Sequence, residues 1–548
     1  MKILRIFVRN TWNLGYMEMT GLRKLHIGIQ DFESLKMDGY LYVDKTEQIY
    51  RLISTGRYYF LSRPRRFGKS LLLSTIKCIF EGKRELFDGL AIATKPDIKW
   101  EKHPVLHLDL NTQQYDSPDK LDNVLNAALS RWESVYGKDP NEKDFGPRFE
   151  GVIRRAYEQT GLRAVILVDE YDKPMLQAIG NVELQEAYRA TLKGFYGALK
   201  SMDGCIRFAM LTGVTKFGKV SVFSDLNNLR DISMLPQYYD ICGISETELH
   251  TFFEKEVNKL AGRMHISRSE AYAVLKENYD GYRFTAESTY YTEDDRELPI
   301  QGIYNPFSVL NALANSKTGG YWFETGTPSY LVYLLQKHDY NLEEMSHQKA
   351  TEDVLNSIDA ESTNPIPVIY QSGYLTIKDY DREFGTYTLG FPNEEVEEGF
   401  TKYLMPSYIH PQDRRSPFLV NNFVEDVREG RTEQFIKRLR SLFADTPYEL
   451  VQNLENHYRN VVWLLFKLMG FYTQAEYHTS EGRIDLVVGT PKYCYVMEFK
   501  LDGTAEQALA QIQDKSYTLP FEIEDRQIVR IGISFDSATR NIDQCLVG

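Results

Sequence analysis

Gly68, Lys69 and Ser70 stand between an apolar run, residues 58–61, and a run with helical spacing, residues 71–80. This order predicts a strand, a loop and a helix that begins at the lysine. Backbone N–H groups at a helix N-terminus hold phosphate oxygens. A lysine there reaches the β- and γ-phosphates, and the hydroxyl after it binds Mg²⁺. The pattern therefore predicts a phosphate loop that binds ATP.

The first half of this loop departs from the usual pattern GxxxxGK[ST]. Arg63 replaces the first glycine, and Pro64 removes one N–H donor. Arg63, Arg65 and Arg66 offer charge instead, which favours charge-assisted contacts to phosphate. The alternative is a basic turn before an ordinary helix. We expect nucleotide contacts from Arg65, Arg66, Phe67, Gly68, Lys69 and Ser70.

Two carboxylates end an apolar, strand-like run downstream, at residues 164–168. In phosphate-loop proteins a carboxylate at this place holds Mg²⁺ and another residue orients water. We assign these roles to Asp169 and Glu170. Thr212 follows another candidate strand, so it meets them at the carboxyl edge of a parallel sheet. Its hydroxyl either senses the γ-phosphate or caps the following turn.

A second charged group lies near the C-terminus, in the strand-like runs 482–488 and 493–500. Side chains alternate faces along a strand, so Asp485, Glu498 and Lys500 share one face. Two carboxylates can hold Mg²⁺, and a metal with a lysine can activate water and stabilise charge on a phosphodiester. The alternative is a surface hairpin with a Glu–Lys pair.

A hairpin centred on the Thr-Pro dipeptide at 490–491 sets the expected register. In it Gly489 faces Lys492 and Asp485 faces Val496. Glu498 is then the diagonal neighbour of Asp485, at roughly 7–8 Å between backbones.

Helices are expected on both sides of this hairpin. The first, residues 454–469, carries Glu455 near its start. The second, residues 505–517, places polar side chains at i, i+4 and i+8, which either cover the acidic edge or face water. These side chains are Gln507, Gln511 and Lys515.

The chain resembles the AAA-ATPase-like proteins that carry a C-terminal PD-(D/E)XK nuclease domain, over nearly its whole length. The segments that carry the resemblance are YVDKT (42–46), RPRRFGKS (63–70), VDEYDKP (168–174), LTGVTKF (211–217), YDGY (279–282), YNPF (304–307), GRIDL (482–486) and EFK (498–500). It implies a P-loop core and a restriction-endonuclease-like fold. It also implies that Asp485, Glu498 and Lys500 are nuclease catalytic residues, joined by Glu455 as the helical carboxylate.

Length and composition set the broad class. The chain has 548 residues, 43% hydrophobic and 26% charged, which indicates a globular protein of several domains. No run approaches the ~20 apolar residues of a membrane helix, and the first 20 residues lack the apolar core of a signal peptide. Five scattered cysteines without CxxC spacing argue for a reducing compartment and against zinc. We therefore expect a cytoplasmic protein without a membrane partner.

Net charge opposes an extended nucleic-acid surface, because affinity for the phosphate backbone comes largely from Lys and Arg. The formal charge is −13, with acidic runs at 293–297 and 394–398. Basic residues collect at 63–66 and between 414 and 440, so a nucleic-acid partner requires a local patch. An oligomer is compatible with the sequence, which carries no signal for one.

The expected fold class is α/β. It combines a P-loop parallel sheet with helices on both faces, a mainly helical middle region and a C-terminal restriction-endonuclease-like domain. The expected boundaries are 1–21 for an N-terminal extension, 22–240 for the AAA-ATPase-like domain, 241–350 for a helical lid, 351–445 for a mixed connecting domain and 446–548 for the nuclease-like domain.

Our leading interpretation is an ATP-binding, ATP-hydrolysing protein that controls a C-terminal Mg²⁺-dependent nuclease acting on DNA or RNA. The alternative is a nucleotide-switched signalling or scaffolding protein whose C-terminal module binds nucleic acid or protein without cleaving. A third class, a small-molecule kinase, is weakened by Glu170, which suits activation of water.

Overall fold

The computed structural model describes residues 23–216, 228–292, 295–323, 329–356, 364–408, 416–444, 454–470, 486–522, 526–539 and 541–548. The chain divides into two compact units. The first combines Met1–Gly326 with His347–Val396, and the second combines Thr327–Ser346 with Glu397–Gly548. None of the helices in the described ranges has the length and apolar character that crossing a bilayer requires.

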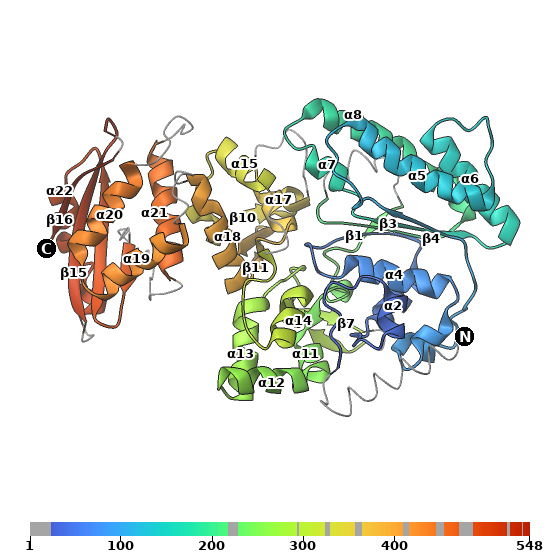
Figure 1. Cartoon of the computed structure of the whole chain (residues 1–548), viewed down its shortest axis with the longest axis horizontal. Coiled ribbons are helices and arrows are strands. Elements are labelled where there is room, and N and C mark those ends of the chain that lie inside the picture. Colours follow the sequence, from blue (N-terminus) through green and yellow to red (C-terminus); the bar gives the residue numbers. More distant parts are fainter. Residues whose placement is uncertain are drawn as a thin grey trace. The chain divides into compact units, whose positions relative to one another are not determined.

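A five-stranded parallel sheet forms the centre of the first unit, in the order β2-β3-β4-β1-β5. Its strands are β1 (Tyr58–Ser62), β2 (Val105–Asp109), β3 (Ala164–Asp169), β4 (Ile206–Gly213) and β5 (Arg230–Asp231). Helix α4 (Lys69–Phe80) lies on one side, and α5 (Pro118–Tyr136), α6 (Phe145–Thr160) and α8 (Val182–Tyr196) lie on the other (Figure 1). Because both faces are covered, every residue of β1 and β3 is buried. The predicted α/β class is confirmed.

Shorter elements complete this layer. They are α2 (Phe32–Met37), α3 (Thr46–Thr55), η1 (Arg84–Phe87), η2 (Ala91–Thr94), α7 (Lys173–Gln177), α9 (Ala198–Ser201) and η3 (Asp203–Cys205). The segment before β1 is anchored by Asp44. Its carboxylate accepts from the backbone and hydroxyl of Thr46 and from the N–H of Ala91.

The next region is mainly helical, as the sequence predicts. Its elements are η4 (Pro236–Tyr238), β6 (Ile244–Ser245), α11 (Glu246–Phe252), α12 (Glu254–Met264), α13 (Arg268–Tyr279), β7 (Thr289–Tyr291), β8 (Glu297–Pro299), β9 (Ile303–Tyr304) and α14 (Pro306–Asn315). A capping box of Ser245 and Glu248 starts α11. Leu249, Val257 and Leu275 belong to the buried core of this region.

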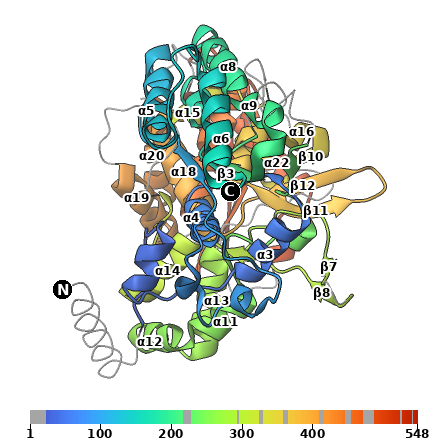
Figure 2. The ribbon, with the colours of Figure 1, turned by 90° about the vertical axis from the view of Figure 1, so that its right-hand side faces the viewer.

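The first unit ends in a small antiparallel sheet, in the order β10-β12-β11. Its elements are β10 (Lys349–Thr351), α16 (Glu352–Asn356), α17 (Ile366–Gln371), β11 (Thr376–Asp381) and β12 (Thr386–Gly390). The hairpin of β11 and β12 projects from its neighbours (Figure 2). Helix α18 (Glu394–Tyr408) then begins in the first unit and continues into the second.

The second unit contains a four-stranded sheet, in the order β13-β14-β15-β16, in which only β14 and β15 are parallel. Its elements are α15 (Ser329–Lys337), η6 (Leu342–His347), α19 (Ser416–Arg428), α20 (Thr432–Ala444), α21 (Leu454–Gly470), β13 (Leu486–Gly489), β14 (Tyr493–Leu501), α22 (Ala505–Asp514), η8 (Leu519–Phe521), β15 (Gln527–Asp536) and β16 (Asn541–Val547).

Helices pack on both faces of this sheet. On one face α22 approaches β15 closely at Gly532, where an added Cβ would lie 2.3 Å from the carbonyl oxygen of Ala505. On the other face the hydroxyl of Tyr495 donates to the carbonyl of Val427 in α19, at 2.9 Å. The sheet is therefore the middle layer of an α/β/α sandwich.

Candidate functional site

The loop between β1 and α4 surrounds the amino group of Lys69. Its Nζ donates hydrogen bonds to the carbonyl oxygens of Arg63, at 3.0 Å, and Pro64, at 3.3 Å. The same atom lies 3.1 Å from Oε1 of Glu170, and Lys69 is buried. The first N–H groups of α4 have no partner within the helix. Backbone donors and a lysine cation thus occupy one place, which is what phosphate binding requires.

Gly68 forms the turn from the loop into α4. Its φ of 96° lies in the left-handed region that favours glycine. An added Cβ would meet no atom within 4 Å, so the backbone conformation, and not a lack of space, favours glycine here. Ser70 follows in the first turn of α4 and is half-buried. Its hydroxyl is therefore placed beside the loop.

Asp169 and Glu170 end β3 next to the end of β4. The hydroxyl of Thr212 donates to Oδ1 of Asp169 at 2.6 Å, and both residues are buried. Thr212 thus orients Asp169, a role that neither sequence-based interpretation included. Glu170 has a φ of 54°, an uncommon conformation for a residue with a side chain. Its carboxylate reaches Lys69 from this turn.

Asp172 is a buried carboxylate that the sequence analysis did not single out. It accepts from the N–H of Thr215 at 2.6 Å and from its hydroxyl at 2.7 Å, so it ties the turn after β4 to the end of β3. Burial, together with the nearby charge of Glu170, raises the pKa of Asp172 to about 6.

Arg63 does not point toward the start of α4. Its guanidinium is buried and donates to the carbonyl oxygens of Ser62, Ser233 and Tyr238, at 3.0, 2.7 and 3.0 Å. The expectation that Arg63 contacts phosphate is therefore wrong. Both terminal nitrogens of the guanidinium donate to backbone carbonyl oxygens on the inner side of the loop.

The other loop residues divide between surface and interior. Arg65 and Arg66 are exposed, and the guanidinium of Arg66 lies 5.0 Å from the ring centre of Phe307. Phe67 is buried, with its ring edge-on to Tyr282 at 4.8 Å. The side chain of Phe67 therefore supports the loop from the interior, and Phe67 also lines the pocket beside Gly68.

A small pocket of about 70 Å³ lies beside Gly68 and the start of α4. Its apolar lining includes Val43, Leu72, Ile244 and Pro306. His26 also lines it, with Nδ1 2.7 Å from the carbonyl oxygen of Leu41. Because a carbonyl only accepts, Nδ1 carries the proton and Nε2 is the acceptor. Burial lowers the pKa of His26, which favours this neutral ring.

Sequence reasoning missed this pocket, because its walls come from segments far apart in the chain. Three quoted motifs contribute to its lining: 42–46 supplies Tyr42, Val43 and Lys45, 63–70 supplies Phe67 and Gly68, and 304–307 supplies Pro306. The motif at 42–46 supplies the most. That motif entered the sequence analysis only through the family resemblance, without a role.

The C-terminal group is built on β14. Nζ of Lys500 lies 2.9 Å from Oε1 of Glu498 and 2.6 Å from Oε1 of Gln511. Glu498 is 1% exposed. The predicted common face of Glu498 and Lys500 is confirmed. The polar side chains of α22 were expected either to cover the acidic edge or to face water, and Gln511 covers the acidic edge.

The predicted register of the hairpin is wrong by two residues. Gly489 pairs with Cys494, not with Lys492, and Val487 pairs with Val496. The reason is a wider turn, closed by Thr490. Its N–H donates to the carbonyl of Tyr493 at 2.8 Å, and its hydroxyl accepts from the N–H of Tyr493 at 2.9 Å. This side-chain closure leaves four residues, 490–493, between the paired residues Gly489 and Cys494 instead of the expected two.

Two predicted members of this group lie outside the described part of the structure. Asp485 falls in the range 471–485 and directly precedes Leu486, the first residue of β13. Glu455 is in α21, but its side chain is not among those described. The distance between Asp485 and Glu498 and the role of Glu455 therefore stay predictions.

The oxygen donors at both places fit a divalent ion. Among the residues that the structure describes, no three His, Cys, Asp or Glu side chains form a metal cluster. Mg²⁺ does not need one, since it takes one or two carboxylates with water and phosphate oxygens. Asp169 and the hydroxyl of Ser70 meet this requirement in the first unit, and Glu498 offers one carboxylate in the second.

Comparison with known proteins gives two family matches and one relative of nearly full length. Residues 26–223 match a family described as predicted AAA-ATPase, and residues 453–545 match the PD-(D/E)XK nuclease superfamily. An uncharacterized protein in the vnfD 5' region of Azotobacter chroococcum mcd 1 is 34% identical over 534 residues. The alignment covers 95% of this chain and 98% of that protein.

Proposed function

This chain belongs to the family of predicted AAA-ATPases with a C-terminal PD-(D/E)XK nuclease superfamily domain, and on this premise we propose that it binds and hydrolyses ATP to control a Mg²⁺-dependent nuclease acting on DNA or RNA. The observation that carries the proposal is the meeting of Lys69, Asp169 and Glu170 at one edge of the parallel sheet. Nucleotides bind at this edge in open α/β sheets.

Each part of the first site has a role in ATP binding. The N–H groups at the start of α4 and the amino group of Lys69 hold the phosphates. Ser70 and Asp169 hold Mg²⁺, which neutralises phosphate charge when bound. The apolar pocket beside Gly68 takes the base, and Nε2 of His26 is an acceptor in its wall.

Hydrolysis depends on Glu170. Its carboxylate ends β3 next to the metal-binding Asp169, the position from which a base orients water. The 3.1 Å contact with Lys69 holds Glu170 toward the phosphate side of the sheet edge. A small-molecule kinase is less consistent with this geometry, because it would bring a substrate hydroxyl where Glu170 lies.

Cleavage of nucleic acid depends on β14. Glu498 and Asp485 hold Mg²⁺, which supplies Lewis-acid character at a phosphodiester. Lys500 stabilises the charge that develops on the phosphate. The 2.6 Å contact with Gln511 keeps the amino group of Lys500 at the acidic edge.

Control of the nuclease requires a connection from the phosphate loop, and Trp322 supplies one. Its indole N–H donates to the carbonyl of Arg65 at 3.1 Å, and its backbone N–H donates to Glu395 at 2.7 Å. The same carboxylate accepts from the hydroxyl of Ser308 at 2.6 Å. Glu395 lies at the start of α18, the helix that continues into the second unit.

The deciding experiment is a cleavage assay on linear, circular and single-stranded DNA and on RNA, with and without ATP, in Mg²⁺ or Mn²⁺ and in EDTA. We expect metal-dependent cleavage whose rate changes with ATP. Lys69→Ala should lose tight ATP binding and the ATP effect, yet keep metal-dependent cleavage. Lys95→Ala is the matched control, because Lys95 pairs with Glu47 on α3 and not with the loop.

Two results would contradict parts of the proposal. Wild-type ATP affinity in Lys69→Ala would remove the phosphate-loop assignment. ATP binding without cleavage of any of these substrates would remove the nuclease assignment and leave a signalling or scaffolding protein.

A further inference from the structure

Arg63 occupies the place that glycine holds at the start of an ordinary phosphate loop, and it is 1% exposed. Its three hydrogen bonds reach carbonyl oxygens in three places: the end of β1 (Ser62), the residues after β5 (Ser233) and η4 (Tyr238). The centre of its guanidinium also lies 4.0 Å from the ring centre of Phe284. A cation so placed over an aromatic ring is attracted to the ring face.

The backbone of the same residue faces the nucleotide side. The carbonyl oxygen of Arg63 accepts from Nζ of Lys69, and so does the carbonyl oxygen of Pro64. Pro64 in turn lies against Gly373, where an added Cβ would come within 2.6 Å of the proline ring. The side chain of Arg63 therefore sets the position of the two carbonyl groups that hold Lys69.

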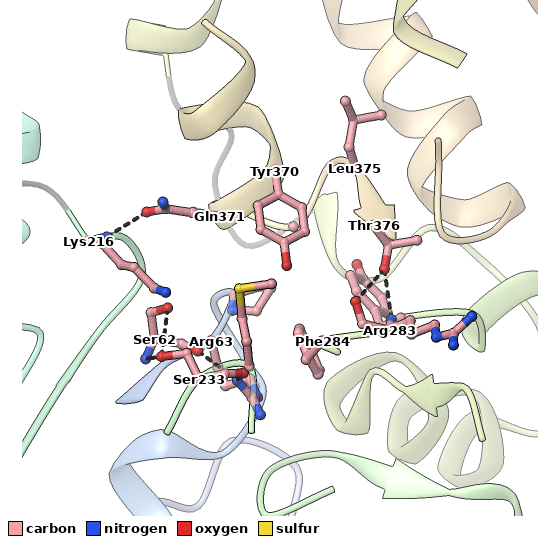
Figure 3. Close-up of a pocket in the computed structure, with 14 residues that line it drawn as sticks. Ser62, Arg63, Lys216, Ser233, Arg283, Phe284, Tyr370, Gln371, Leu375 and Thr376 are labelled. Atoms are coloured by element: carbon pink, nitrogen blue, oxygen red, sulfur yellow. Dashed lines mark hydrogen bonds between the residues drawn. The ribbon is translucent and has the colours of Figure 1, made fainter. Parts of the chain in front are cut away.

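A small pocket of about 20 Å³ lies behind this part of the loop. Figure 3 shows Arg63 and Ser233 on one side of it and Tyr370 and Gln371 on another. Because the pocket is so small, the packed residues around it and the hydrogen bonds of Arg63 together hold the first half of the loop in place. Burial lowers the pKa of Arg63 only to about 10, so the side chain keeps its positive charge at neutral pH.

We propose that Arg63 is a positioning residue for triphosphate recognition: it anchors the phosphate loop from within and so aims Lys69, without touching the nucleotide. This inference rests on the proposed ATP binding and deepens it. It explains why a loop without its first glycine still presents Lys69. Glycine's conformational freedom usually allows this turn, whereas here the buried guanidinium of Arg63 fixes it through three hydrogen bonds.

Glycine, the residue at this place in an ordinary phosphate loop, should weaken ATP binding here. Arg63→Gly leaves the carbonyl groups of Ser233 and Tyr238 without this donor and leaves a void next to Phe284. Arg63→Met fills the space but donates no hydrogen bond. Arg63→Lys keeps the charge but cannot reproduce a planar fork to three acceptors.

The test measures affinities for fluorescent ATP, ADP and AMP in the full chain. For the three Arg63 variants we expect ATP affinity to fall about tenfold or more, because hydrogen bonds of a charged group are lost. AMP affinity should change less than about twofold, which corresponds to well under 1 kcal/mol. The ratio of ATP to AMP affinity is the informative readout, since general destabilisation weakens both ligands alike.

Arg207 offers matched controls, Arg207→Lys and Arg207→Met. It also donates to a backbone carbonyl, of Ile53 at 3.1 Å, and lies over an aromatic ring, Phe80 at 5.8 Å, but it is at the start of β4. These controls should keep the wild-type ratio. If the Met and Gly variants do not fold, Arg63→Lys decides.

An unchanged ratio in the folded Arg63 variants, or equal losses for ATP and AMP, would overturn the inference alone. A wild-type chain that binds no ATP would instead overturn the proposed function. The two failures are therefore distinguishable.

Discussion

Both candidate sites pair a buried or half-buried lysine with a glutamate, yet the two pairs are built differently. Lys69 and Glu170 lie 3.1 Å apart but come from α4 and the end of β3. Lys500 and Glu498 lie 2.9 Å apart on one strand, two residues from each other. The first pair exists only when the sheet is assembled, whereas the second follows from strand geometry.

The supports of the two sites differ in the same way. At the first site Thr212, in β4, holds Asp169 by a hydrogen bond. Arg63, directly after β1, binds the carbonyl of Ser233. At the second site Gln511, from the helix that follows β14, holds Lys500. The activity of a site assembled from distant segments should therefore fall when residues that never touch substrate are changed. A local site should respond mainly to its own charged groups.

The largest effect is expected at the local site. Lys500→Ala removes the cation that faces developing phosphate charge, so cleavage should fall about a thousandfold. Asp485→Asn should abolish cleavage through loss of a metal-binding carboxylate. Both effects are measured as cleavage rates on the best substrate, and circular dichroism shows whether each variant is folded.

Lys492→Ala is the control, because Lys492 is exposed in the turn of the same hairpin. ATP affinity should stay at the wild-type value in all three variants. Cleavage by Lys500→Ala at more than a tenth of the wild-type rate would place the active site elsewhere.

Glu170→Gln tests the assembled pair. The amide cannot act as a base, so ATP hydrolysis should slow about a hundredfold. ATP affinity should be retained, because Lys69 and the loop remain. Glu183→Gln, on the exposed first turn of α8, is the control. Unchanged turnover in Glu170→Gln would mean that another residue orients water.

Thr212→Val tests whether support matters at the assembled site. It removes a buried donor at 2.6 Å from Asp169 while keeping the shape of the side chain. We expect about tenfold slower hydrolysis and a higher Mg²⁺ requirement, with a loss of about 1–2 kcal/mol in stability. Thr212→Ser restores the hydroxyl and should recover both. A valine variant with normal Mg²⁺ dependence would show that Thr212 has only a packing role.

The smallest effect is expected from Gln511→Ala. Lys500 keeps its contact with Glu498 and water can replace the lost amide acceptor, so cleavage should fall only about threefold to tenfold. Gln513→Ala, exposed on the same helix, serves as the control. A loss as large as that of Lys500→Ala would mean that both sites depend equally on their supports, and would remove the contrast between them.

Much of the fold followed from periodic patterns. Continuous apolar runs predicted β1 and β3, because a parallel sheet covered on both faces buries every residue of its inner strands. Alternation predicted that Glu498 and Lys500 share a face. The register of the hairpin was missed, because a single hydroxyl, that of Thr490, widened the turn. Turn closure by a side chain depends on one residue and leaves no periodic signal.

Residue order along the chain was enough to predict the loop before α4 with Lys69, the carboxylates at the end of β3 and the Glu-x-Lys pair of β14. These features need only local order along the chain: a strand end, a helix start or two residues on one pleated face. Tertiary structure alone decided that Arg63 points inward, that Thr212 donates to Asp169 and that a pocket opens beside Gly68. The physical reason is burial. A desolvated donor or acceptor must find a partner, and which partner is near depends on segments that meet only when the sheet and its helices have assembled.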